Sequence, residues 1–491
     1  MATFLVLASL VATAITTRYF LSWYRLRHVP GPFLESLTSL IQLKRCLEGE
    51  CHVYYNEIAE KYGPLVRIGP NEVMFSDPET LRRCSAVRSP YTRGEYYEAA
   101  CVSPGKHHSF SIIDDAAHTA LKKKVSPGYS GLDNGGFEPA VDDMVKALVD
   151  LIERKYISTD TEANPIEFAH RAQFFTLDTI SDVAHSKPFG HLEKDEDVFQ
   201  YIHYTSLTIP VFTSILVIPG LYKWIQRWPL NKLAPTSMDK YGIGMMMGFA
   251  EKLVDERMRP GAKQHRDIVQ SFINHGLTRD EIIQETCIQI LGGSDTTATA
   301  MRMTLLYLIN TPPALRKLLA EIDEGIASGK ISSPISNAEA LALPYLQAVI
   351  REGLRVFPPA VGVVYKAVPK GGDTIHGYFL PEGTQVGQNL WGMQHSRKIF
   401  GADADSFRPE RWLTADKDQL NNMIGTQELV FGYGKYLCLG KQMALMELNK
   451  IFVELLRRYE FSVVNPLKPM AIRNAALWVT DDFWLKITRR G

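Results

Sequence analysis

The amino-terminal segment is the longest stretch in which apolar side chains dominate. Residues 1–17 carry no charged side chain, and the apolar run continues to Tyr24 with Arg18 as its one charge. About 20 mainly apolar residues are enough to cross a bilayer as a helix. We therefore predict a single-pass transmembrane anchor over residues 1–24. Because the basic residues follow the run, the rest of the chain is expected on the cytosolic side.

A cleaved signal peptide is the alternative for this segment, since an Ala-x-Thr sequence near position 14 offers a cleavage site. Signal peptides place their basic residues before the apolar run, whereas here Arg18, Arg25 and Arg27 follow it. We interpret residues 25–34, which contain the sequence Val-Pro-Gly-Pro-Phe, as a basic, proline-rich hinge. Residues 35–491 then form one globular domain.

The pattern in that domain predicts mainly helices. The sequence Thr-Arg-Asp-Glu at 278–281 is a capping box, and it opens a long helix that we expect to end near Asn310, ahead of a Pro-Pro pair. Further helices are predicted over residues 114–126, ending before the next proline, and over residues 343–356.

Short strands are predicted between the helices. Residues 65–68 and 72–75, separated by Gly-Pro-Asn, are typical of a hairpin. Residues 360–364 are predicted as an apolar strand, and residues 375–386 as a hairpin that turns at Pro-Glu-Gly, 381–383.

Composition narrows the choice of function. A length of 491 residues would suit about three domains, but no linker, repeat or charge block divides the chain. Lys and Arg (54) balance Asp and Glu (54) without a basic stripe, which argues against a nucleic-acid partner. The six cysteines form neither a CxxC pair nor a disulfide framework, so a reducing, cytosol-facing location is predicted; they are Cys46, Cys51, Cys84, Cys101, Cys287 and Cys438.

The candidate chemistry lies in the loop from Phe431 to Gly440, Phe-Gly-Tyr-Gly-Lys-Tyr-Leu-Cys-Leu-Gly, which precedes a helix-forming run. A cysteine in a glycine-rich loop at a helix amino terminus lies where backbone N–H groups favour the thiolate. Cys438 is therefore a candidate ligand or nucleophile. The alternative is that Cys438 is a small buried apolar residue.

Two nucleotide-binding interpretations of these glycines fail. A phosphate-binding loop needs four residues between its glycines and Ser or Thr after its Lys. Here five residues separate Gly434 from Gly440, and Gln442 follows Lys441. A dinucleotide fingerprint would need glycine at position 437, which is leucine.

With this spacing of phenylalanine, glycines and cysteine, the loop resembles the haem-binding loop of the cytochrome P-450 family. The resemblance covers nearly the whole chain and implies a mainly α fold with small β-sheets (α+β), in which a long central helix lies over a haem held by the cysteine loop. It implies that the Cys438 thiolate is the axial ligand of the iron of haem b. Phe431 would pack over the sulfur, while Gly434 and Gly440 would let the backbone pass close to the porphyrin.

The middle of the long helix, Gly292-Gly293-Ser-Asp-Thr-Thr, matches the family's oxygen-binding motif. Two glycines inside a helix cost about 1 kcal/mol each against alanine, so something other than helix stability placed them. One explanation is close packing against another helix. The resemblance implies instead a groove for O2 and an ordered water, with Asp295 and Thr296 as the acid–alcohol pair that supplies protons.

Three charged residues resemble the family's Glu-Arg-Arg network. Glu352 and Arg355 lie on one face of a predicted helix, and alone they would make a weak surface ion pair. Together with Arg411 in the sequence Phe-Arg-Pro-Glu-Arg-Trp, they imply a structural role in holding the cysteine loop.

The positions that usually bind the haem propionates depart from the family. His118 and Lys122 stand where Trp and Arg are usual, Lys366 where a second arginine is common, and Tyr436 where the family has Arg or His. A lysine still neutralises a carboxylate, but as a point charge without the guanidinium fork. The alternative for the Lys122–Lys124 run is a solvated face.

The resemblance implies a haem-thiolate monooxygenase that uses O2 to oxidise a lipophilic small molecule. Because the chain shows no flavin or nicotinamide site, electrons would come from an NADPH-cytochrome reductase on the same endoplasmic reticulum membrane. Several stretches are similar to filamentous-fungal members such as pisatin demethylase, many of which act in secondary metabolism. The alternatives are an O2-independent haem-thiolate isomerase or dehydratase, and a non-catalytic haem-binding membrane protein.

Three further segments are interpreted from the resemblance. The uncharged run at residues 204–222 contains two prolines, so we predict an apolar segment over the substrate entrance and not a second membrane span. Residues 360–364 would face the substrate. Trp478 and Phe483 either close the pocket or pack in the core.

Overall fold

The computed structural model describes residues 13, 16, 17, 20–133, 135–218, 220–225, 227–414 and 416–491. Most of the anchor predicted over residues 1–24 lies outside the described residues. Within the described ranges, no helix combines the length and the apolar composition that crossing a bilayer requires.

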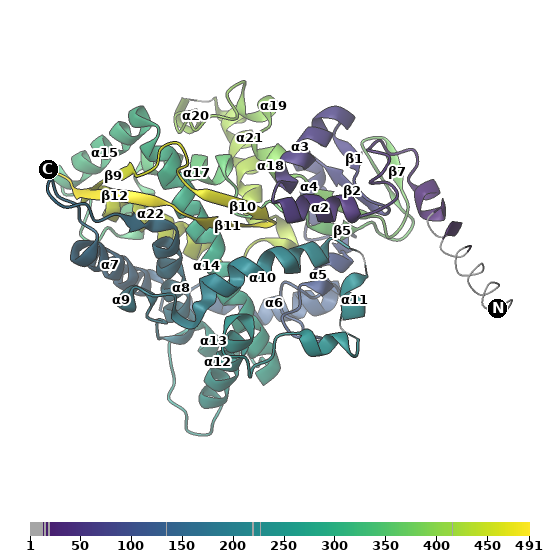
Figure 1. The fold of residues 1–491 in the computed structure, drawn as a ribbon, viewed down its shortest axis with the longest axis horizontal. Coiled ribbons are helices and arrows are strands. Elements are labelled where there is room, and N and C mark those ends of the chain that lie inside the picture. The colour runs from purple at the N-terminus through teal and green to yellow at the C-terminus, as the bar shows by residue number, and fades with distance from the viewer. Residues whose placement is uncertain are drawn as a thin grey trace.

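The long helix α14 (Arg279–Ile309) lies near the centre of the molecule (Figure 1). Its capping box forms as predicted, because Thr278 Oγ1 accepts a hydrogen bond from the Glu281 N–H while the Glu281 carboxylate accepts one from the Thr278 N–H. Packing against α8, α12, α17 and α22 buries most of α14. The other helices are α2 (Leu40–Glu48), α3 (Cys51–Tyr62), α4 (Pro78–Ser85), α5 (Glu95–Ala99), α6 (Asp115–Tyr129), α7 (Glu138–Lys155), α8 (Phe168–His185), α9 (His191–Lys194), α10 (Tyr201–Leu216), α11 (Leu221–Ile225), α12 (Gly242–Arg257), α13 (Ile268–Asn274), α15 (Pro312–Ala327), α16 (Asn337–Leu341), α17 (Pro344–Val356), α18 (Leu390–Gln394), α19 (Arg397–Phe400), α20 (Arg411–Thr414), α21 (Lys417–Gln427) and α22 (Lys441–Leu456).

Four small sheets complete the mainly helical fold that was predicted. The largest has the strand order β1-β2-β8-β5-β3, and the others are β4-β12-β9, β10-β11 and β6-β7. The predicted hairpin at residues 65–75 is confirmed as the antiparallel pair β1–β2. The strands are β1 (Leu65–Arg67), β2 (Glu72–Phe75), β3 (Thr92–Arg93), β4 (Ile166–Glu167), β5 (Tyr365–Ala367), β6 (Asp373–Ile375), β7 (Tyr378–Leu380), β8 (Gln385–Gln388), β9 (Tyr459–Val463), β10 (Ala471–Ala475), β11 (Leu477–Asp481) and β12 (Trp484–Arg489).

The predicted end of one helix and one predicted strand were wrong. Helix α6 continues through Pro127 to Tyr129, because a proline in the last turn removes one backbone hydrogen bond without preventing that turn. Residues 360–364 do not form a strand. Ala360 makes an isolated antiparallel bridge to Leu477, and the N–H groups of Val361 and Gly362 both donate to the carbonyl of Ala476.

The hairpin predicted to turn at residues 381–383 was also wrong. Strands β6 and β7 pair around His376 and Gly377, which both have positive φ angles of 49° and 82°. Strand β8 then leaves the hairpin and runs between β2 and β5 in the largest sheet. The Pro-Glu-Gly turn therefore connects two different sheets.

The predicted hinge at residues 25–34 is docked on the domain. Leu26 and Val29 are buried in a cluster with residues of β1, β2 and β8. Arg25 donates to the Glu382 carbonyl at 2.9 Å, which fixes the hinge beside the β6–β7 hairpin. The apolar run at residues 204–222 lies largely in α10, with Pro210 inside the helix.

Candidate functional site

The cysteine loop ends at the amino terminus of α22, as the sequence predicts. The Cys438 N–H donates to the Phe431 carbonyl at 2.7 Å, which closes the loop. Leu439 and Met443 pack in one cluster with residues of the first half of α14. The loop is therefore held next to the central helix.

The surroundings of Cys438 act on the pKa of its thiol in opposite directions. Burial raises the pKa of the thiol, while the backbone N–H groups of Gly440 and Lys441 and the positive charges of Lys122 and Lys441 oppose the rise. Desolvation is the largest of these effects, and the helix end opposes it. Neighbouring atoms surround the thiol, yet part of the residue remains open to solvent. A bound metal ion would supply the missing stabilisation of the anion.

The two loop glycines serve different purposes. Gly434 has φ +58°, and a Cβ there would lie 2.2 Å from the Ser85 carbonyl oxygen, so the contact with the chain's own backbone requires glycine. A Cβ added at Gly440 would meet no described atom within 4 Å. Gly440 therefore borders open space.

The two glycines of α14 also differ in the space around them. A Cβ at Gly293 would lie 3.0 Å from the Ile180 side chain of α8, which is the close helix packing considered above. Gly292 is exposed, and a Cβ there would meet no described atom within 4 Å. The Thr296 hydroxyl donates to the Gly292 carbonyl at 2.8 Å. Gly292 and Thr296 therefore share an open stretch of the central helix.

Asp295 faces a different environment from Thr296. It is buried, and its carboxylate accepts hydrogen bonds from Gln173 of α8 at 2.5 Å and from the Tyr201 hydroxyl of α10 at 3.2 Å. Burial raises the pKa of Asp295, and the nearby charge of Arg302 opposes that rise. The predicted acid is thus joined to α8 and α10. Sequence reasoning did not find Gln173 or Tyr201, because neither belongs to a local motif.

Two of the four predicted propionate partners, His118 and Lys366, lie against the ring of a third, Tyr436. The His118 ring centre lies 5.7 Å from it, and the Lys366 ammonium lies 5.3 Å from it. Lys122 turns inward and donates to the Lys435 carbonyl at 2.8 Å, so it is not part of a solvated face. The Tyr436 hydroxyl itself donates to Asp115 at 3.1 Å.

Arg93 is a fifth member of this cluster that sequence reasoning missed. Strand β3 pairs with β5 so that Arg93 lies opposite Lys366, and the guanidinium lies 5.0 Å from the Tyr436 ring centre. Arg93 is buried, and its Nη1 donates to the carbonyls of Ser109 and Ile112. No motif marks this arginine, since strand pairing brings it to the site.

The cluster fits a group that carries carboxylates, because buried charges require partners. Within the described residues, the Lys366 ammonium makes no hydrogen bond or ion pair, and neither His118 Nδ1 nor Arg93 Nε has a hydrogen-bond partner. Burial and the neighbouring Arg93 lower the pKa of Lys366 to about 8. Burial, Arg93 and Lys122 lower the pKa of His118 to about 4. The residues present therefore fit the propionates of a haem.

The predicted Glu-Arg-Arg residues come together at a buried site. Glu352 accepts two hydrogen bonds from Arg355, at 2.8 and 2.9 Å, and one from Arg411 at 2.9 Å. The Trp412 indole N–H adds a fourth at 3.0 Å. All three charged side chains are almost fully buried, so they are not a surface ion pair.

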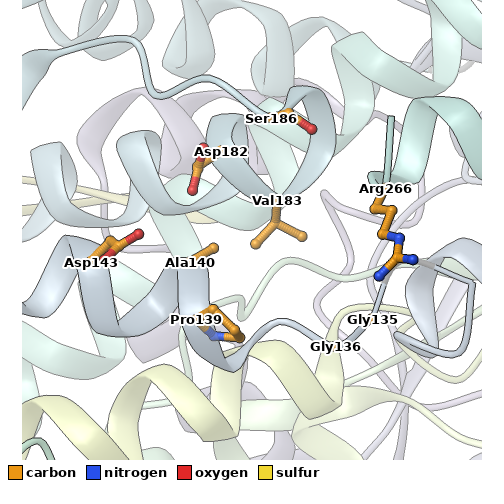
Figure 2. A pocket seen from close by; sticks show the side chains of 9 residues that line it. All are labelled: Gly135, Gly136, Pro139, Ala140, Asp143, Asp182, Val183, Ser186 and Arg266. Carbon is orange, nitrogen blue, oxygen red and sulfur yellow. The ribbon is translucent and has the colours of Figure 1, made fainter. Parts of the chain in front are cut away.

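The two aromatic residues near the carboxyl terminus pack in the core. Trp478 donates from its indole N–H to the Pro358 carbonyl at 2.8 Å, and Phe483 is fully buried against Phe168. A surface cavity of about 310 Å³ lies between α7 and α8 (Figure 2). None of the predicted site residues lines that cavity, which includes Asp143, Asp182 and Arg266.

Comparisons with known proteins agree with this geometry. Residues 29–483 match the family model for cytochrome P-450. The chain is 40% identical over 485 residues to cytochrome P-450 monooxygenase ABA1 of Pyricularia oryzae, covering 97% of this chain and 95% of that protein. It is 35% identical over 467 residues to cytochrome P-450 monooxygenase aba1 of Botryotinia fuckeliana, covering 94% and 92%.

The fold is also similar to that of a solved haem domain. The crystal structure of the cytochrome P-450DA haem domain has a TM-score of 0.75 against this chain at 16% identity, covering 94% of this chain and 98% of that one. Family and fold imply a haem cofactor, and members use O2, a small-molecule substrate and a redox partner. The chain belongs to the cytochrome P-450 family of monooxygenases.

Proposed function

We propose that this chain is a haem-thiolate monooxygenase that oxidises a lipophilic small molecule, with Cys438 as the axial thiolate of haem b. The observation that carries the proposal is the buried cation cluster beside the exposed Cys438, in which Lys366 has no anionic partner among the described residues. When bound, haem supplies the activation of O2 and the transfer of one oxygen atom to the substrate.

The chain's own residues bind and orient the cofactor. Arg93, Lys122 and Lys366 would neutralise the propionates, and the unpartnered His118 Nδ1 would add one further polar contact. Gly440 borders open space, Cys438 is exposed, and Phe431 would pack beside the sulfur. Glu352, with its two arginine partners, keeps the loop's scaffold rigid.

Proton supply is assigned to Asp295 and Thr296. The Thr296 hydroxyl, held by the Gly292 carbonyl, orients a water in the open stretch of α14. Asp295 lies on the buried side of α14 and replaces the proton that this water gives up. Gln173 and Tyr201 hold its carboxyl group in place. A Thr296→Ala variant should keep its haem but release peroxide in place of oxidised substrate. Full coupling of electron uptake to product in that variant would contradict this role.

The proposal includes a membrane setting. Residues 1–24 anchor the chain in the endoplasmic reticulum membrane, residues 25–34 are the hinge, and residues 35–491 are the cytosolic catalytic domain. Electrons come from an NADPH-cytochrome reductase on the same membrane. The named fungal monooxygenases among the relatives support a role in fungal secondary metabolism.

The ferrous–CO difference spectrum tests the central assignment. Wild-type protein should give the strongly red-shifted Soret band of thiolate ligation, and a Cys438→His variant should lack that band while its haem remains detectable by the pyridine haemochrome. A Soret band that is unchanged by the substitution would overturn the assignment of Cys438.

A further inference from the structure

Two cysteine sulfurs meet at the corner between α2 and α3. Cys46 lies in the last turn of α2, and Cys51 is the first residue of α3. Their Sγ atoms are 2.8 Å apart, against about 2.05 Å in a disulfide. Among the described residues, no other two cysteine sulfurs are in hydrogen-bond contact.

Contacts with β10 fix the corner that brings the sulfurs together. Gly49 turns the chain with φ +80°, and a Cβ there would lie 2.6 Å from Arg473 Cγ. The Gly49 carbonyl accepts a hydrogen bond from the Asn474 N–H at 3.2 Å, and Arg473 donates to the Leu47 carbonyl at 2.6 Å. The two thiols are therefore held in contact by the fold around them.

Both cysteines line a cavity of about 30 Å³, although they are only 9% and 6% exposed. The opposite wall of the cavity includes Thr213 of α10 and Val217 just after that helix, together with Val363. The cavity has room for about one molecule the size of water. A small uncharged oxidant is the class of reagent that can reach the sulfurs.

The surroundings give the two thiols different roles. The hydrogen bond between the sulfurs, together with burial, raises the pKa of Cys51, so Cys51 keeps its proton. Its thiol also lies 3.9 Å from the Gln42 carbonyl, an acceptor for that proton. Because the Cys51 thiol faces that acceptor, we assign the attack to Cys46, with the second thiol next to it.

We propose that Cys46 and Cys51 form a reversible intrachain disulfide when hydrogen peroxide enters the cavity. The Cys46 sulfur attacks one peroxide oxygen, an S–O bond forms, the O–O bond breaks, and water leaves. The Cys51 sulfur then attacks Cys46, an S–S bond forms, the S–O bond breaks, and a second water leaves. The two thiols lose two electrons and two protons, and the peroxide is reduced to two waters.

The disulfide fixes the corner that forms one wall of the cavity beside α10. This inference does not depend on the proposed function, because neither cysteine belongs to the haem site. A thiol reductant such as dithiothreitol restores the two thiols.

Peptide mass spectrometry tests the proposal on the full-length haem-loaded protein. Trypsin cleavage after Arg45 and Lys61 gives residues 46–61, a single peptide with both cysteines. The protein is treated with graded doses of peroxide, the excess is removed with catalase, and the denatured protein is alkylated with iodoacetamide. This peptide should then no longer react with iodoacetamide and should be about 2 Da lighter than the dithiol. Dithiothreitol should restore double alkylation. The peptides of Cys84, Cys101 and Cys287 should stay alkylated at the same dose.

Two other results would overturn the proposal. One is addition of about 16 or 32 Da to peptide 46–61, which means that each sulfur oxidises separately. The other is oxidation of Cys84, Cys101 or Cys287 at a lower dose than the pair. A Cys51→Ser variant adds a second readout, since Cys46 should then gain oxygen in place of forming the crosslink. An unaltered Cys46 in that variant would contradict its role as the attacking sulfur.

Discussion

Replacing Lys366 with methionine should stabilise the haem-free protein and weaken its hold on haem. The pKa of this buried lysine is about 8 in the folded chain, against about 10.4 for an exposed lysine. Each unit corresponds to about 1.36 kcal/mol, so the protonated side chain costs the haem-free fold about 3 kcal/mol at pH 7. The cation–π contact with Tyr436, at 5.3 Å, returns about 1–2 kcal/mol because the ammonium is buried. The net gain for Lys366→Met is therefore about 1–2 kcal/mol.

The sign of the pH dependence follows from the direction of the shift. Because folding lowers the pKa of Lys366, the folded chain binds this proton less tightly than the unfolded chain does. The cost of burying the charge is complete below about pH 8, where both states are protonated. It shrinks as the pH rises from 8 towards 10.4, because the folded lysine has then lost its proton. The advantage of Lys366→Met should accordingly fall below about 1 kcal/mol at pH 10.

Urea unfolding of the haem-free parent and variant at pH 7 and pH 10 measures this difference. Haem transfer to apomyoglobin measures the opposite effect, because a propionate that has lost its ammonium partner should leave faster from Lys366→Met. Lys366→Arg is the matched control, since it keeps the charge and should retain haem. A haem-free Lys366→Met protein that is less stable than the parent at pH 7, or a stability difference independent of pH, would refute the reasoning.

Four further substitutions test other parts of the protein by unfolding measurements. Glu352→Gln leaves two buried guanidinium groups without their carboxylate and should cost about 3–5 kcal/mol, and a loss below about 1 kcal/mol would contradict the buried network. Gly292→Ala should gain up to about 1 kcal/mol of helix stability, whereas Gly293→Ala should be less stable than Gly292→Ala because its Cβ meets a side chain at 3.0 Å; equal effects would be evidence against this division. Burial raises the pKa of Glu285 to about 7, so its contribution to stability, present below about pH 4.3, is lost as pH rises through 7. The parent should lose about 3 kcal/mol between pH 5 and pH 8 relative to Glu285→Gln, and parallel curves would show that Glu285 does not titrate in this range.

The sequence predicted the parts of the fold that depend on neighbouring residues. The capping box at Thr278, the first hairpin and the cysteine at the start of α22 are set by contacts within a few positions. The second hairpin failed because its turn uses His376 at positive φ, which only a minority of non-glycine residues adopt. The Pro-Glu-Gly sequence gave a stronger local signal at a place where the chain changes sheets.

The sequence could not predict side chains that long-range packing brings to the site. Gly434 is required by a carbonyl at position 85, far from it in the chain. Tyr201 and Gln173 reach Asp295 because α8 and α10 cross the central helix. These contacts depend on tertiary packing, and no spacing within the sequence encodes them.

The propionate site shows how such a contact changes the meaning of a motif. His118, Lys122 and Tyr436 stand at positions where the family usually has residues that bind anions more strongly. Taken one position at a time, they suggest a weakened site. The pairing of β3 with β5 places Arg93 opposite Lys366 and returns a guanidinium to the cluster. Since buried anions respond to the total positive charge around them as well as to each hydrogen bond, the cluster compensates for its substituted members. Haem retention should therefore depend on Arg93 as strongly as on any position that the family motif identifies.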